Sequence, residues 1–230
     1  MSPAVGSRGN SGPAVPQRWL RKTPAQQRGH DTVEAFASAA EELLRTRPFE
    51  DIAIRDIVRR AGRPIGSFYA LFASKEALLP LLYQRYHEGL QSVFAAELGR
   101  VNWSSLDFDA TVAAMVDLVM LQYEERPWLI RALALFSRQT PEALPPDTVE
   151  RRGRVYDQLV KVLIRYRARI AHPDPETAIR FAVFAASSIA REKMLFGEAP
   201  LSRITPMDRQ VLREELVRLV RSYLAAEVDR

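Results

Sequence analysis

The chain of 230 residues contains no cysteine. It therefore cannot form disulfides, zinc–thiolate sites or a thiol nucleophile, which fits a reducing compartment. It also has no apolar run approaching the ~18 residues that a membrane-spanning helix needs. The N-terminal segment lacks the apolar core of a secretory signal. We therefore expect a cytoplasmic protein with no membrane partner.

The sequence also lacks the motifs of common catalytic sites. It has no GxSxG turn, no phosphate-binding loop and no HExxH pair. Its three histidines, His30, His87 and His172, lie far apart and have no metal-ligand spacing. We therefore expect no enzymatic activity, no metal and no cofactor.

Acidic residues are absent from the first 28 positions, which hold five of the 33 basic residues. The remaining 202 residues carry 28 charges of each sign, so the excess charge of +5 lies in this segment. Its Pro, Gly, Ser and Gln content predicts a disordered basic arm over residues 1–28. Such an arm can follow a phosphate backbone or enter a minor groove, or it can be a passive tail.

Strand-like alternation is absent, and the rest of the chain has helical periodicity, which predicts an all-α fold of about nine helices. Capping residues indicate the starts of several helices. The predicted helices cover 31–46, two short segments within 54–72, 74–98 with Pro80 near a kink, 112–123, 127–137, 147–170, 175–196 and one that starts near 205–208.

The segment from 54 to 78 predicts a helix-turn-helix. Ile54, Ile57, Val58 and Ala61 have the spacing of one helical face. Gly62 follows where a helix stop favours a residue that tolerates positive φ, and Pro64 suits a first helical position. Ile65, Phe68, Tyr69 and Phe72 then repeat the helical spacing. The second helix of such a unit enters the DNA major groove.

The string DIVRRAGRPIGSFYALFASKEALL resembles the DNA-binding domain of TetR-type (tetracycline-repressor-like) regulators. This resemblance implies a three-helix DNA-binding domain over 29–78 and a helical effector-binding and dimerisation domain over 79–230. It also implies a homodimeric repressor that binds a palindromic DNA operator and is released by a small hydrophobic or aromatic effector.

The resemblance assigns DNA contacts by position. Tyr69, Lys75 and Ser67 match residues that contact operator phosphates, and Arg55 matches a backbone or base-edge contact. Sequence readout falls to Arg63, Ile65, Gly66 and Ala70, because an Arg can bind guanine and an apolar group can contact a thymine methyl. Two positions depart from the pattern: residue 53 is Ala instead of a capping Ser or Thr, and residue 63 is Arg instead of a small apolar residue. Arg63 is therefore either a base contact or an ion-pair partner.

The C-terminal half predicts an apolar effector pocket and a dimer interface. The candidate pocket residues are apolar or aromatic and fit ordinary core packing as well: Met115, Val119, Tyr123, Trp128, Phe136, Tyr156, Phe181 and Phe184. The last two helices, near 175–196 and 208–224, are apolar on more than one side, which predicts a homodimer interface formed by this pair. They could instead complete the core of a single chain.

Two other functions remain open. The first is a carrier or binding protein for small hydrophobic molecules that binds DNA weakly and without sequence preference. The second is a nucleoid-type DNA-binding protein that has no effector. Flat binding across DNA sequences would indicate either of them.

Overall fold

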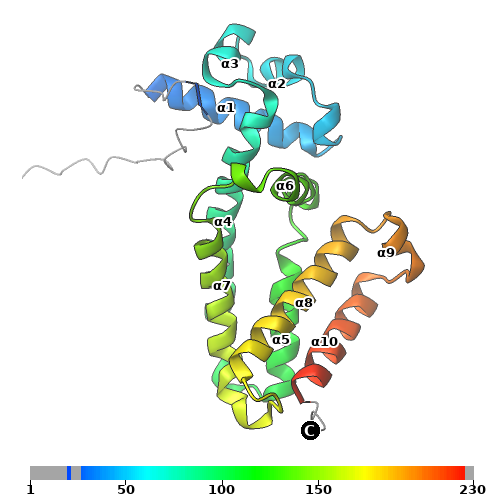
Figure 1. The fold of residues 1–230 in the computed structure, drawn as a ribbon. Coiled ribbons are helices and arrows are strands. Elements are labelled where there is room, and N and C mark those ends of the chain that lie inside the picture. The colour runs from blue at the N-terminus through cyan, green and yellow to red at the C-terminus, as the bar shows by residue number, and fades with distance from the viewer. Residues whose placement is uncertain (1–19, 22–26, 226–230) are drawn as a thin grey trace, which may run out of the picture.

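The computed structural model describes residues 20–21 and 27–225. Within these residues the chain forms ten α-helices and several short 3-10 turns, with no named strand, so the all-α prediction is confirmed. Three helices form a small unit at one end, and the long helix α4 (Leu79–Arg100) connects it to a bundle built from the remaining helices (Figure 1).

The small unit is the predicted helix-turn-helix. It consists of α1 (Gln27–Leu44), α2 (Ile54–Ala61) and α3 (Ile65–Leu71). Gly62 ends α2 with φ of 62°, a left-handed conformation that favours glycine. The rings of Phe36 and Phe68 meet edge-on at a centroid distance of 5.2 Å, and Phe72 lies 6.2 Å from Phe36. These buried rings hold α1 and α3 together.

Ala53, at the start of α2, has no side chain that can cap the helix, and Asp56 takes over part of this role. The Asp56 carboxylate accepts a hydrogen bond from the Ala53 N–H at 3.4 Å. The same carboxylate pairs with Arg47 at 3.2 Å and with Arg59 at 3.0 Å. An acid in the first turn of a helix is favoured by the helix dipole, so α2 is anchored without a Ser or Thr cap.

The bundle follows α4 in the order α5, α6, α7, α8, α9 and α10. The bounds are α5 (Phe108–Leu121), α6 (Pro127–Gln139), α7 (Thr148–Leu163), α8 (Pro175–Leu195), α9 (Pro200–Ile204) and α10 (Arg209–Ala225). Helices α5, α8 and α10 pack against one another, and α7 packs against α5 and α8 (Figure 1). A bidentate ion pair from Arg213 on α10 to Asp117 on α5 adds to this packing.

Several predicted helix boundaries need correction. Pro80 lies in the first turn of α4, where proline is tolerated. The helix predicted from residue 74 begins only at Leu79, because a 3-10 turn, η3 (Lys75–Leu78), precedes α4. The Asp147 carboxylate accepts a hydrogen bond from Arg151 Nε at 2.5 Å and makes no capping hydrogen bond to α7, which ends at Leu163. Asp174, in contrast, caps α8 by accepting from two backbone N–H groups.

The base of the predicted disordered arm is ordered. Leu20 is only 7% exposed and forms an antiparallel bridge with Phe72. The Arg21 N–H donates to the Leu71 carbonyl at 2.9 Å, so this part of the chain lies beside the end of α3. The rest of the arm, 1–19 and 22–26, lies outside the described residues. Within the described chain, no helix is long and apolar enough to cross a membrane.

Candidate DNA interface and effector pocket

The outer face of α3 carries side chains that the core does not cover. Ile65 is 50% exposed and Tyr69 is 45% exposed, whereas Phe68 between them is fully buried. Gly66 and Ala70 are exposed on the same helix, and a Cβ added at Gly66 would meet nothing within 4 Å. Ser67 is half-buried. Large apolar groups left in solvent indicate a contact surface, and a surface on this helix can approach a DNA groove.

The arginines near this face differ in their partners. Arg59 pairs with Asp56 at 3.0 Å, and Arg60 pairs with Glu42. Arg55 and Arg63 are exposed and form no ion pair with any acid among the described residues. Of the two roles that the sequence left open for Arg63, the geometry favours contact with DNA.

The Lys75 ammonium forms hydrogen bonds within the protein. Its Nζ donates to the carbonyls of Phe49, Glu50 and Ile52 at 2.9, 2.8 and 2.9 Å, and it lies 5.0 Å from the centre of the Phe49 ring. These carbonyls belong to the 3-10 turn η2 (Phe49–Asp51) and the residue after it, between α1 and α2. An ammonium has three N–H donors, so none remains for a phosphate in this conformation.

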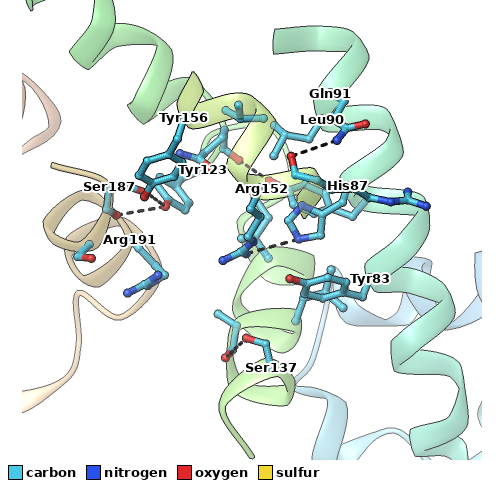
Figure 2. A pocket seen from close by; sticks show the side chains of 18 of the residues that line it. Tyr83, His87, Leu90, Gln91, Tyr123, Ser137, Arg152, Tyr156, Ser187 and Arg191 are labelled. Atoms are coloured by element: carbon cyan, nitrogen blue, oxygen red, sulfur yellow. Dashed lines mark hydrogen bonds between the residues drawn. The ribbon is translucent and has the colours of Figure 1, made fainter. Parts of the chain in front are cut away.

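A cavity of about 340 Å³ lies among α4, α6, α7 and α8 (Figure 2). This volume is in the range of small-molecule sites. Helix α4 contributes Tyr83, Tyr86, His87, Leu90 and Gln91. The other helices and the turn after α5 contribute apolar, hydroxyl, amide and arginine side chains: Gln122, Tyr123, Ile130, Leu133, Ala134, Ser137, Arg138, Arg151, Arg152, Val155, Tyr156, Phe184, Ser187, Ser188 and Arg191.

The tyrosine hydroxyls of the cavity remain protonated, and two of them are fixed by hydrogen bonds. Tyr123 Oη lies 2.8 Å from Ser187 Oγ, a pair that Figure 2 shows, and Tyr86 Oη donates to the Gln122 carbonyl at 3.0 Å. Burial raises the pKa of Tyr83, Tyr123 and Tyr156 above the ordinary value of 10. The cavity therefore has polar points but no tyrosinate.

His87 is buried in this cavity as a neutral imidazole. Desolvation, with the positive charges of Arg152 and Arg151, lowers its pKa to about 3. Its ring lies 4.2 Å from the Tyr83 ring and 5.0 Å from the Tyr86 ring, and its Nε2 lies 3.5 Å from Arg152. A neutral ring nitrogen can accept a hydrogen bond, so His87 orients the Arg152 guanidinium.

Known proteins resemble this chain in sequence and in fold. A family model described as bacterial regulatory proteins, tetR family, matches residues 37–82. An uncharacterised HTH-type transcriptional regulator, YwcC of Bacillus subtilis, is 23% identical over 90% of this chain and 99% of its own length. The regulator EthR of Mycobacterium tuberculosis is 41% identical, but only over 26% of this chain and 28% of EthR.

The helix-turn-helix unit of this chain, residues 37–82, is of the TetR-family type. A TetR transcription regulator from Haloarcula marismortui has the same fold, with a TM-score of 0.60 and 16% identity over 87% of this chain and 100% of that one. TetR-family regulators are ligand-responsive DNA-binding proteins, and this chain is a DNA-binding transcriptional regulator.

The regulator's cavity brings together only some of the predicted pocket residues. Tyr123, Tyr156 and Phe184 line it. Met115 and Val119 do not, because they are buried in the packing of α5.

The other three predicted pocket residues also lie elsewhere. Trp128 and Phe136 line hollows between α6 and the DNA-binding unit. Phe181 is 53% exposed, and its ring lies 5.2 Å from that of Tyr223 on α10.

The aromatic residues of α4 and the arginines of α7 and α8 were missed as candidates. The spacing of Tyr83, Tyr86, His87 and Leu90 places them on one face of a helix, which could have indicated a pocket. The same spacing is typical of a helix face that packs in the core.

Proposed function

We propose that this TetR-family regulator is a homodimeric repressor that binds a palindromic operator and is released when a small hydrophobic effector fills the cavity among α4, α6, α7 and α8. The observation that carries this proposal is the position of α4. Tyr83, Tyr86, His87, Leu90 and Gln91 of this helix line the cavity, and its first turn packs on the DNA-binding unit. Residues 29–78 would form the DNA-binding domain and residues 79–230 the effector and dimerisation domain.

The outer face of α3 supports the DNA-binding part of the proposal. Ile65, Gly66 and Ala70 would contact base edges, with Tyr69 and Ser67 on phosphates. Arg55 and Arg63 would supply positive charge toward the DNA. Both are exposed, and neither forms an ion pair with an acidic residue in the part of the chain that the structure describes. Lys75 would act indirectly, by holding the turn between α1 and α2.

The exposed apolar side chains of α8 and α10 support the dimer. Phe181 and Phe184 on α8 are 53% and 57% exposed, and Val211, Leu219 and Tyr223 on α10 are also exposed. Aromatic groups concentrated on one helix pair favour an interface formed by the same patch on two copies. A two-fold axis between the copies would also match a palindromic operator.

A second connection, through α6, supports release by an effector. Arg126, next to the start of α6, pairs with Glu41 of α1 at 2.9 Å. The guanidinium of Arg45, the residue after α1, lies 5.1 Å from the centre of the Trp128 ring on α6. Ile130, Leu133 and Ser137 of α6 line the cavity. A ligand that moves α4 or α6 would therefore move the DNA-binding unit.

The test is to incubate the purified protein with fragmented DNA from its source organism and to sequence the retained fragments. Enrichment of a few fragments that share a palindrome supports the proposal, and uniform retention contradicts it in favour of non-specific binding. Light scattering tests the dimer. Phe181→Glu should give a monomer, whereas Val149→Glu, a change at an exposed residue of α7, should not.

A further inference from the structure

We infer that the effector is an organic anion: a hydrophobic body with one carboxylate-like group that binds between Arg152 and Arg191. This inference rests on the proposed effector function of the same cavity and defines its ligand class. The arginines enter the cavity from α7 and α8 (Figure 2).

The charged side chains of the cavity lining are all basic. Four arginines line it, and no aspartate or glutamate does. Arg151 is neutralised by Asp147 at 2.5 Å and Glu88 at 3.3 Å. Arg138 lies 5.7 Å from the centre of the Phe196 ring.

Arg152 and Arg191 carry part of the unmatched charge. Neither forms an ion pair with an acid among the described residues. Arg138 also forms no ion pair with a described acid, so three guanidinium charges of the lining have no ionic partner.

Arg191 also has an unused donor. Its Nε is buried from solvent and has no hydrogen-bond partner in the structure. A buried N–H without an acceptor is unfavourable, and a carboxylate oxygen would supply a charged one. The Nε and an Nη of a guanidinium can bind both oxygens of one carboxylate. This unsatisfied donor distinguishes the site from a set of solvated surface arginines.

Arg152 is held where it can share the same anion. His87 lies 3.5 Å from one of its terminal nitrogens, and its guanidinium lies 5.9 Å from the centre of the Tyr83 ring. Both Arg152 and Arg191 act electrostatically on the hydroxyl groups of Tyr123 and Tyr156, which places the two charges around one region of the cavity. His87 stays neutral, so it does not balance the charge of Arg152.

The rest of the lining suits an apolar body. Leu90, Ile130, Leu133 and Val155 line the same cavity, together with the tyrosine rings. A neutral hydrocarbon would leave the polar groups of the cavity without partners, and this would weaken its binding. A hydrophobic cation would in addition be repelled by the arginines.

The test uses three probes with one chain and different head groups: decanoate, 1-decanol and decyltrimethylammonium. Each is titrated calorimetrically into the full-length protein near neutral pH, below its micelle-forming concentration. We expect decanoate to bind about tenfold or more tightly than decanol, since ionic hydrogen bonds are about twice as strong as neutral ones. Decyltrimethylammonium should bind most weakly.

Variants assign this preference to the two arginines. Arg191→Gln and Arg152→Gln should remove most of the preference for decanoate over decanol and leave decanol affinity unchanged. Arg154→Gln is the matched control, because Arg154 is exposed on α7, pairs with Glu150 and lies outside the cavity lining.

The inference is overturned if decanol binds as tightly as decanoate, or if decanoate affinity is unchanged in both cavity variants. Failure of all three probes to bind also overturns it, while the operator selection still tests the proposed DNA-binding function. If decanoate binds through Arg191 but does not release operator DNA, the effector function fails and the ligand class stands.

Discussion

Replacing Lys75 with methionine should destabilise the DNA-binding unit without removing a phosphate contact. Methionine keeps most of the aliphatic stem and removes the ammonium, so the carbonyls of Phe49, Glu50 and Ile52 lose their shared donor. The resemblance to TetR-type regulators assigned Lys75 to an operator phosphate, whereas its three donors are occupied within the chain. The two roles give different results in two measurements.

The expected loss of stability follows from the three hydrogen bonds. A hydrogen bond to a charged group contributes about 1.5–3 kcal/mol when buried. Lys75 is only half-buried, so water would replace part of each bond, and we expect a total loss of about 2–3 kcal/mol. For a chain of this size, that corresponds to a decrease in Tm of about 4–12 °C.

Thermal unfolding followed by circular dichroism measures this change, with Lys161→Met, a change at an exposed lysine of α7, as the control. Operator affinity is then measured at several salt concentrations, well below the transition. If Lys75 acts only within the protein, the slope of log affinity against log salt stays the same. An unchanged Tm with a slope smaller by about one charge would refute this reasoning and restore the phosphate contact.

Three further predictions concern base readout, the arm and pH. Arg63→Ala should reduce discrimination at one operator position by about 1–3 kcal/mol, measured on single-base operator variants, and an unchanged preference would give Arg63 a structural role. Deletion of residues 1–19, which leaves the buried Leu20 in place, should lower operator affinity and its salt dependence if the arm contacts DNA; equal affinity would identify a passive tail. The pKa of His87 is about 3 in the folded protein against 6.5 when unfolded, so the unfolded state binds more protons below pH 6.5. Stability should therefore fall on acidification through this window, by about 2 kcal/mol more in the native chain than in His87→Phe between pH 6.5 and 5. Urea unfolding at both pH values measures this difference, and identical losses would contradict the burial of a neutral imidazole.

The helix-turn-helix was predictable because its signals are local. Gly62 marks a turn that needs positive φ, and the spacing of Ile57, Val58 and Phe68 identifies the buried faces. The same spacing could not assign Ile65 and Tyr69, because an apolar stripe about 100° wide on so short a helix extends past the core boundary.

The cavity was less predictable because it depends on four helices that are distant in sequence. Phe181 and Phe184 are three residues apart on α8 and look equivalent in the sequence, yet only Phe184 lines the cavity. Arg152 and Arg191 have the sequence context of ordinary surface arginines. Their significance depends on the lack of an acid in the lining, which is a property of the assembled bundle.

The arrangement of α4 limits how an effector can act on DNA. His87 lies eight residues from Leu79, or about 12 Å along the helix axis, so a displacement at the cavity reaches the DNA-binding unit through a short helical segment. An effector releases DNA only if it binds the conformation unsuited to DNA more tightly. By linkage, operator DNA must then weaken effector binding by the same factor by which the effector weakens operator binding. The two guanidinium groups favour an anion in any conformation that keeps them together, so release requires that α4, α6 or α8 change the cavity between the two states. Equal decanoate affinity with and without operator would mean that the cavity binds its ligand without regulating DNA binding.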